Sequence, residues 1–158
     1  MNPGCHGDSQ SEKILFYTHK NWIYDNFSAF RVAWGGIDWY TVEHAYQASK
    51  FILEPKILEL IKMSRSPHEA KQLAKKFKDK IRADWKKVKL KIMESIVRSK
   101  LDQHPYIQGK LLATGDAEIV EDSPKDSFWG RGPDWNGQNH MGKIWMKLRE
   151  ELRNSRKE

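Results

Sequence analysis

Cysteine is almost absent from this chain of 158 residues, which contains only Cys5. One cysteine excludes an internal disulfide framework and any zinc site built from several cysteines. Disulfides are typical of small proteins in oxidising compartments. The composition therefore favours a reducing compartment, and we expect an intracellular, cytoplasmic protein.

Long hydrophobic runs and secretory signals are also missing. No window reaches about 18 consecutive apolar residues, the length that a membrane-spanning helix needs. Residues 1–13 lack the apolar stretch of a signal peptide. We therefore expect neither a membrane span nor a membrane partner.

The motifs of several common enzyme classes do not occur. The sequence has no HExxH, no pair of histidines at metal-binding spacing, no GxSxG and no phosphate-binding P-loop. Gly130-Arg131-Gly132 lacks the strand and the helix that flank a dinucleotide-binding loop. What remains is acid–base chemistry without a metal or a cofactor, or plain binding.

The residues that are abundant indicate one folded domain. Aromatic residues make up 11% of the chain and include seven tryptophans, too many for a disordered protein even with 31% charged residues. A chain of this length usually forms one domain with a substantial core. We expect that domain at residues 13–153, between a disordered tail at 1–12 and a short tail at 154–158.

Positive charge is concentrated in one segment. The chain carries a net charge of +7, but residues 71–100 alone hold twelve Lys or Arg and three acids, a net +9. The other residues together carry −2. Such a segment is either an ordinary solvated face or a patch that meets phosphate, on nucleotides or on nucleic acid.

Hydrophobic periodicity predicts a mainly helical α+β domain with a small N-terminal antiparallel β-sheet. Short apolar runs predict strands at 14–17 and 118–121, and a hairpin of 30–34 with 37–40 around Gly35-Gly36. Helical spacing predicts helices at 42–53, 56–63, 67–77, 85–102, 105–114 and 140–153. The expected N-caps are Thr41, Ser66 and Asp84, with Glu69 completing a capping box.

The first candidate site is a polar stripe on the helix that begins after Thr41. Glu43, Gln47 and Lys50 are spaced i, i+4 and i+7, so their side chains line one face of an otherwise apolar helix. The stripe is either a solvated face or one wall of a cleft. In a cleft, partial burial raises the pKa of the carboxyl and lowers that of the amine, towards acid–base or imine chemistry.

The second candidate is the irregular segment 122–139, which is rich in Gly, Pro, Asp and Asn. Long irregular segments inside small domains are often functional. Glycines let the backbone approach a ligand, Trp129 offers a stacking face, and acids or amides can bind ribose hydroxyls. The alternative is a loop held in place by a tryptophan in the core.

Smaller signals lie elsewhere in the chain. Asn26 and Ser28, near Phe16, suit a phosphate or a base, and they serve a turn or a core equally well. Trp85 heads the Lys-rich helix as a core anchor or a stacking platform. His44 lies off the polar stripe and is typical of a hydrogen-bonded structural histidine.

Taken together, these segments resemble the NADAR family, also called YbiA-like proteins, over residues 14–152. The motifs that carry the resemblance are Phe16-Tyr17, Asn26-Phe27-Ser28, Thr41-Val42-Glu43-His44, Gln47-Ala48, Lys50-Phe51, Arg82-Ala83-Asp84-Trp85, Leu111-Leu112-Ala113-Thr114, Ile119-Val120-Glu121, Asp126, Phe128-Trp129-Gly130, Gly132, Asn139 with Gly142, and Leu148-Arg149. The resemblance implies an N-glycosidase that acts at C1 of a ribose. Some members are similar to hydrolases of ribosylamino-pyrimidine phosphates, which are early riboflavin intermediates. Others remove ADP-ribose from the amino group of guanine in nucleic acid.

The resemblance also implies roles for single residues. Glu43 would act as acid and base, and Asp126 would be its partner or hold the ribose. Lys50 suggests a Schiff-base route beside direct attack by water, and the residues leave both routes open. The substrate-binding residues that the resemblance implies are Phe16, Asn26, Ser28, His44, Gln47, Trp85, Trp129, Gly130, Gly132 and Asn139. No metal ligand and no cofactor are implied.

Three functions stay open at this point. We expect removal of ADP-ribose from guanine, with the basic segment 71–100 meeting the nucleic acid. The second is hydrolysis of riboflavin intermediates, although Pro133-Asp134-Trp135 stands where bacterial members tend to carry glycine-rich residues. The third is a non-catalytic module that binds ADP-ribose or nucleic acid.

Overall fold

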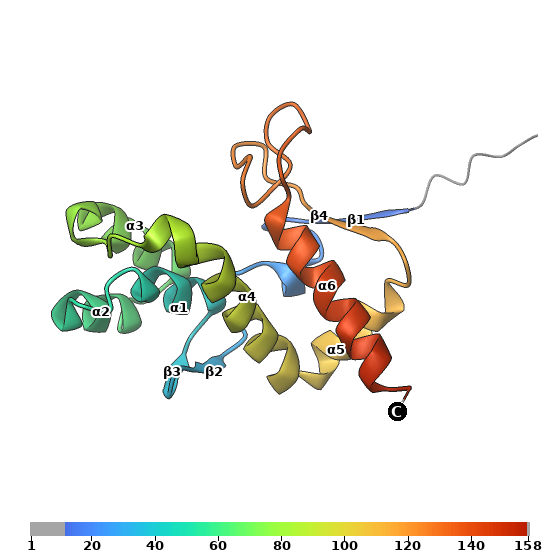
Figure 1. Cartoon of the computed structure of the whole chain (residues 1–158), viewed down its shortest axis with the longest axis horizontal. Helices are drawn as coiled ribbons and strands as arrows, with labels where there is room; N and C mark the ends of the chain where they lie inside the picture. Colours follow the sequence, from blue (N-terminus) through green and yellow to red (C-terminus); the bar gives the residue numbers. More distant parts are fainter. Residues whose placement is uncertain (1–11, 158) are drawn as a thin grey trace, which may run out of the picture.

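The structure is a computed structural model that describes residues 12–157; the tail expected at 1–12 lies outside these residues, apart from Glu12. Within them, helices form most of the fold and the strands form two separate pairs (Figure 1). The helices are α1 (Val42–Ser49), α2 (Pro55–Lys62), α3 (Pro67–Lys76), α4 (Trp85–Gln103), α5 (Pro105–Ala113) and α6 (His140–Ser155). Short 3-10 turns lie at Trp22–Tyr24 and Lys78–Lys80. The predicted mainly helical α+β fold is confirmed.

The helices begin and end close to the predicted positions. Two of them begin at the predicted N-cap residues. Thr41 caps α1 by accepting the backbone N–H of His44, and Ser66 caps α3 by accepting that of Glu69. The helix predicted at 42–53 ends at Ser49, because the chain then turns and Pro55 opens α2. Helix α6 continues to Ser155, two residues beyond the predicted end.

Two of the predicted caps are made differently. The Glu69 carboxylate accepts the backbone N–H of Arg65 instead of that of Ser66, so the capping box is displaced by one residue. The expected cap by Asp84 is wrong at the side chain, because its carboxylate binds the guanidinium of Arg82 at 2.6 Å.

The strands form one antiparallel and one parallel pair. The predicted hairpin is present as β2 (Val32–Trp34) and β3 (Ile37–Trp39), and the turn residues Gly35 and Gly36 have the positive φ angles that it requires. Strand β1 (Lys13–Phe16) does not join this hairpin. It pairs in parallel with β4 (Glu118–Glu121), so it lies beside a strand from far along the chain.

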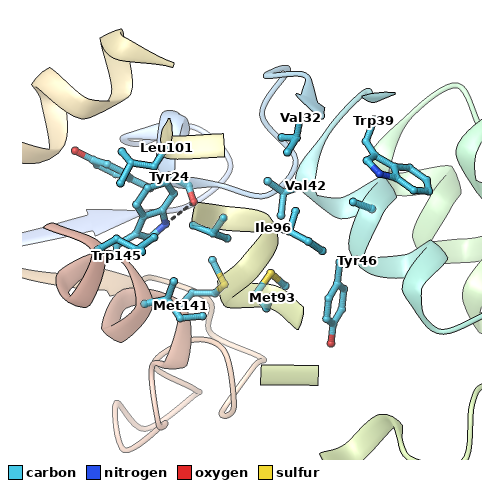
Figure 2. Close-up of a cluster of buried hydrophobic side chains, with 14 of the residues drawn as sticks. Tyr24, Val32, Trp39, Val42, Tyr46, Met93, Ile96, Leu101, Met141 and Trp145 are labelled. Carbon is cyan, nitrogen blue, oxygen red and sulfur yellow. Dashed lines mark hydrogen bonds between the residues drawn. The ribbon is translucent and has the colours of Figure 1, made fainter. Parts of the chain in front are cut away.

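Helix α4 runs through the middle of the fold and carries much of the core (Figure 1). In Figure 2, Met93 and Ile96 of α4 lie between Met141 of α6 on one side and Val42 of α1 on the other. Trp145 is fully buried, and its indole N–H donates to the carbonyl of Tyr24 at 3.1 Å. Each such buried side chain stabilises the fold by about 1.5–3 kcal/mol.

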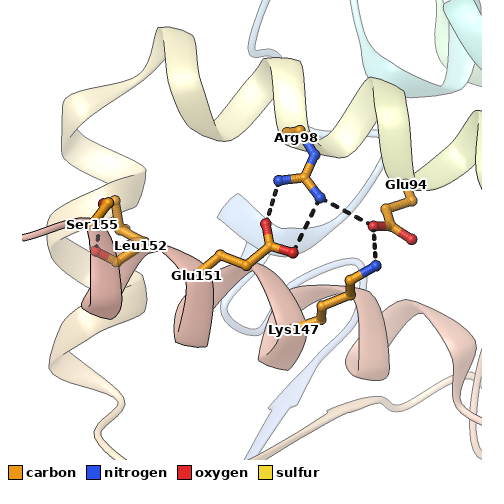
Figure 3. A network of polar contacts seen from close by, with 6 residues as sticks. All are labelled: Glu94, Arg98, Lys147, Glu151, Leu152 and Ser155. Carbon is orange, nitrogen blue, oxygen red and sulfur yellow. Dashed lines mark hydrogen bonds and ion pairs between the residues drawn. The ribbon is translucent and has the colours of Figure 1, made fainter.

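Charged side chains connect α4 and α6 at the surface (Figure 3). Arg98 binds Glu94 and Glu151, and Lys147 binds Glu94 at 2.6 Å. Exposed pairs of this kind contribute about 0–1 kcal/mol each. A hollow of about 190 Å³ between the same helices contains none of the predicted site residues, and Arg98 and Glu151 in its lining are bound to each other.

Lys100 is a buried lysine inside the segment that the sequence presented as basic surface. Its ammonium group, 1% exposed, donates to the carbonyls of Ile23 and Asp25 and to Ser28 Oγ, at 2.6, 3.1 and 2.8 Å. Burial lowers the pKa of Lys100 to about 7. Three acceptors surround Nζ, however, and only the charged ammonium has three N–H groups to offer them. We therefore assign the charged form, which fixes the segment 23–28 beneath α1.

Lys100→Met should lower the free energy of unfolding by about 3 kcal/mol, because three buried acceptors lose their donor at about 1 kcal/mol each. Urea denaturation measures the change. Lys91→Met serves as the control, since Lys91 lies on the same helix and is exposed. A Lys100→Met protein as stable as this control would contradict the assigned role.

Candidate active site

Helix α1 is buried along its whole length, including its polar stripe. The Glu43 side chain is 6% exposed, and its Oε1 accepts a hydrogen bond from Gln47 Nε2 at 2.7 Å. Burial raises the pKa of Glu43, against the opposing effects of the Gln47 hydrogen bond and of Lys71 and Lys50. The reading of the stripe as a solvated face is therefore wrong.

Lys50 follows α1 as its C-cap and is half-buried. Burial lowers the pKa of its amine, with Lys71 and Lys89 acting in the same direction and Glu43 opposing. The Nζ atom lies 5.4 Å from the ring centre of Tyr46 and 5.6 Å from that of Trp85. The stripe thus places a carboxyl with a raised pKa and an amine with a lowered pKa close enough to influence each other.

Two buried oxygen atoms lack a donor within residues 12–157. They are Gln47 Oε1 and Asn26 Oδ1. The Gln47 amide adjoins the carboxyl through its hydrogen bond to Glu43 Oε1. The Asn26 amide lies in the core instead, with its Nδ2 3.5 and 3.7 Å from the sulfur atoms of Met93 and Met141. Buried acceptors normally have partners. Gln47 Oε1 therefore marks a place where a bound molecule can offer an N–H or O–H group.

An aromatic wall stands next to the stripe. The ring of Tyr46 lies 5.1 Å from that of Trp85 and 5.8 Å from that of Trp129. Trp129 in turn packs edge-on against Phe128, and Lys89 Nζ lies 3.7 Å from the centre of the Phe128 ring. Figure 2 shows Tyr46 with its hydroxyl pointing away from the core cluster. The structure therefore brings two of the predicted residues, Trp85 and Trp129, to the stripe. It also places Tyr46 there, which was not among the predicted residues.

Glu121, the last residue of β4, is a site residue that the sequence reasoning missed. Burial, together with the nearby carboxyl groups of Asp126, Asp25 and Glu43, raises the pKa of Glu121 to about 8. The only signal in the sequence was its place in a family motif, since an acid at a strand end is ordinary on a surface.

The loop 122–139 folds on itself, and this occupies several of the predicted ligands. Asp126 Oδ1 accepts the backbone N–H groups of Phe128 and Trp129 at 2.9 and 2.8 Å, which shapes the turn before the aromatic wall. Asn139 bonds β4 through both ends of its amide, to the carbonyl of Ile119 and the N–H of Glu121. Asn139 therefore joins the start of α6 to β4.

The two predicted glycines are required by the protein itself. A Cβ on Gly130 would lie 2.9 Å from both the carbonyl and the carboxyl oxygen of Glu121. Gly132 has a φ of +70°, and a Cβ there would lie 2.6 Å from Ser127 Oγ. Close packing of the loop accounts for both residues without a ligand.

Three more predicted residues have internal roles. Both ring nitrogens of His44 are occupied, by Thr41 Oγ1 at 2.8 Å and the carbonyl of Ser64 at 3.2 Å, as expected of a structural histidine. Phe16 is 1% exposed and packs against Tyr24. Ser28 is a partner of Lys100. All three side chains make contacts within the protein.

The basic segment divides into parts with different functions. Lys71 and Lys89 act on the ionisable groups of the stripe, whereas Arg82 and Arg98 form ion pairs and Lys100 is buried. The remaining lysines are exposed and form no ion pair among the described residues: Lys75, Lys76, Lys78, Lys80, Lys86, Lys87 and Lys91.

Two absences apply to residues 12–157. No three His, Cys, Asp or Glu side chains there are grouped so that they could hold a metal ion. No helix there is both long enough and apolar enough to cross a membrane.

The stability of Glu121→Gln relative to the wild type should increase as the pH rises from about 4.5 to about 8. The carboxyl ionises near 4.5 when unfolded and near 8 when folded, so the folded state binds more protons in this window and stability falls as the pH rises. The amide does not ionise. Thermal unfolding at pH 5 and pH 8 measures the effect, with the exposed Glu118→Gln as control; a Glu121→Gln advantage that shrinks towards pH 8 would contradict it.

Comparison with known proteins identifies the fold and its relatives. The model of the NADAR domain matches residues 9–153. The NMR structure of Escherichia coli YbiA superimposes with a TM-score of 0.85 and 34% identity, over 94% of this chain and 89% of that chain.

Curated relatives agree with this match. N-glycosidase Npun_R5314 of Nostoc punctiforme is 42% identical over 147 residues, 89% of this chain and 94% of its own length. N-glycosidase YbiA of Escherichia coli is 36% identical over 129 residues, covering 82% of this chain and 80% of that protein. The maize riboflavin biosynthesis protein PYRR is 37% identical over 123 residues, which are 72% of this chain and 20% of that protein. The chain belongs to the NADAR family.

Proposed function

We propose that this chain is an N-glycosidase that cleaves the bond between C1 of a phosphorylated ribose and an exocyclic amine, and that its substrate is guanine carrying ADP-ribose. The enzyme class, a hydrolase of N-glycosyl bonds, follows from the family and from relatives that bear the name N-glycosidase. The observation that carries the chemistry is the stripe of α1, where buried Glu43 and half-buried Lys50 have pKa values shifted towards each other.

Glu43 has the properties of the acid that this reaction needs. Breaking a C1–N bond leaves charge on the nitrogen unless a proton arrives as the bond breaks. Glu43, kept protonated by burial, donates its proton to the leaving nitrogen. Its carboxylate then takes a proton from the water molecule that adds to C1, as one carboxyl does in glycoside hydrolysis. Gln47 holds the carboxyl in place through its 2.7 Å hydrogen bond.

Lys50 supports a second route to the same products. A ribose joined to an amine can open to an imine at C1. The neutral amine of Lys50 then adds to C1, the base leaves with its nitrogen, and water hydrolyses the new Schiff base to free both the ribose and Lys50. The lowered pKa of Lys50 favours this route. Direct attack by water needs Glu43 alone, and both routes stay in the proposal.

Groups around the stripe suit the rest of such a substrate. Trp85 and Trp129 offer faces on which a base can stack. Lys71 and Lys89 supply positive charge near the same stripe for phosphate. Asp126 keeps one carboxyl oxygen that forms no hydrogen bond within the described residues, so it can hold a ribose hydroxyl.

The exposed lysines favour a nucleic acid as the carrier of the ADP-ribose. Seven of them, defined above, follow one another along α3, the 3-10 turn and the start of α4. One or two phosphates of a small nucleotide need far less positive charge than this row provides. A polyanion that continues past the site does use it.

The names of two relatives favour a second substrate class. The relatives from maize and Vibrio vulnificus are riboflavin biosynthesis proteins. The ribosylamino-pyrimidine phosphates of that pathway carry the same bond between C1 and an exocyclic nitrogen. The proposed chemistry therefore applies to them without change, and only the leaving base differs.

Glu43→Gln should reduce turnover of an ADP-ribosylated guanine oligonucleotide by about 100-fold or more, since a positioned acid contributes about 10²–10⁴-fold. Released ADP-ribose is measured by chromatography. Turnover of the phosphoribosylamino-pyrimidine, the alternative substrate, is measured in a parallel assay. Glu59→Gln, an exposed acid on α2, is the matched control. Activity on the oligonucleotide should also fall faster with salt than activity on the small nucleotide.

The outcomes separate the three functions. Wild-type turnover of the pyrimidine alone would assign the riboflavin intermediates. Binding of ADP-ribose that persists in Glu43→Gln, with no turnover of any substrate by the wild type, would assign a binding module. Equal turnover by wild type and Glu43→Gln would overturn the role of Glu43.

Borohydride added during turnover should trap a ribosyl adduct on Lys50, because it reduces a Schiff base to a stable amine. Mass spectrometry of the digested protein locates the added mass, and Lys50→Arg serves as the control that cannot form an imine. Confirmed turnover without an adduct would assign direct attack by water.

A further inference from the structure

The Glu121 carboxyl is held in a fixed position but has no partner of its own. Its backbone N–H donates to Asn139 Oδ1 at 2.9 Å, and its carbonyl accepts the N–H of Arg131 at 3.0 Å. The carboxyl itself makes no hydrogen bond and no ion pair with residues 12–157, although the residue is half-buried. A carboxyl placed this way has both oxygens available to a ligand.

The loop backbone closes one side of this carboxyl. The hydrogen atoms of Gly130 face it so closely that a Cβ would lie 2.9 Å from Glu121 Oε2. Trp129, the chain neighbour of Gly130, packs against Tyr46 of α1 with 5.8 Å between the ring centres. The Glu121 carboxyl therefore belongs to the same site as the stripe on α1.

The charges around Glu121 define what it can bind. The nearby carboxyl groups of Asp126 and Asp25 disfavour the binding of an anion such as phosphate at this carboxyl. Hydrogen-bond donors without charge are suited to this place. A ribose offers two vicinal hydroxyls, whose spacing matches the two oxygens of a carboxyl.

We propose that Glu121 binds the ribose whose C1 reacts, with its two carboxyl oxygens accepting hydrogen bonds from the 2- and 3-hydroxyls of that sugar. This inference rests on the proposed function. It gives the substrate a direction in the site: the ribose lies at the carboxyl end, near Glu43, and the phosphates extend towards Lys71 and Lys89.

The test compares ADP-ribose with its analogue that lacks the 2-hydroxyl on the reactive ribose, by calorimetry without turnover. At pH 9, where the Glu121 carboxyl is ionised, the wild type should bind ADP-ribose about 10-fold more tightly than the analogue, because the analogue lacks a hydrogen bond to a charged group. In Glu121→Ala this preference should fall below about 2-fold. Glu118→Gln, an exposed acid on the same strand, should keep it.

Gly130→Ala provides a second variant in which Glu121 is still present. The added methyl group pushes the carboxyl away, so the preference for the hydroxyl should fall here too, provided that thermal unfolding shows a folded protein. A preference that stays near 10-fold in Glu121→Ala overturns the inference.

Failure of the proposed function and failure of the ribose contact give different results. If the wild type discriminates the hydroxyl through Glu121 but turns over no N-ribosyl substrate, the ribose contact stands and the function falls. If it turns over the substrate while Glu121→Ala keeps the preference, the function stands and the contact falls. A wild type that binds neither ligand overturns both.

Discussion

Every residue of α1 is buried, and four of its eight side chains are polar: Glu43, His44, Gln47 and Ser49. Burying a polar group costs several kcal/mol unless it is hydrogen-bonded. His44 and Ser49 satisfy this condition within the protein. Glu43 and Gln47 satisfy it only in part, and the proposed reaction uses this incomplete pairing on a rigid helix. The surrounding fold, from the cap at Thr41 to the loop held by Lys100, keeps that helix in place.

Much of the site was predictable because helical spacing is regular. Glu43, Gln47 and Lys50 share a face at any burial, so their alignment followed from the sequence, whereas their burial did not. Glu121 could not be predicted, because it becomes buried only when β4 pairs in parallel with β1 and the loop folds over it. Helical spacing from Met93, Ile96 and Val97 puts Lys100 on the buried face of α4. Its partners could not be predicted, since only the tertiary fold brings three acceptors to its amine.

The glycines and amides of the loop 122–139 have roles within the protein that the sequence did not indicate. Their composition is typical of a ligand-binding loop, yet Gly130, Gly132 and Asn139 are used for packing and for joining α6 to β4. A loop that must approach its own backbone closely needs the same small and amide residues as one that approaches a ligand. Composition alone cannot separate these causes, whereas contacts can.

The pairing of β1 with β4 also has a consequence during protein synthesis. The ribosome releases residues in order, so β1 has no partner strand until α1 to α5 have been made. Trp129 and the buried face of α6 emerge later still. Helix α1 packs against α2, α3 and α4, which follow it in the chain, so this part can assemble while β1 still has no partner strand. The domain closes only near the end of translation, when β4 and α6 are present, and chaperones have a long interval in which to bind the unpaired β1.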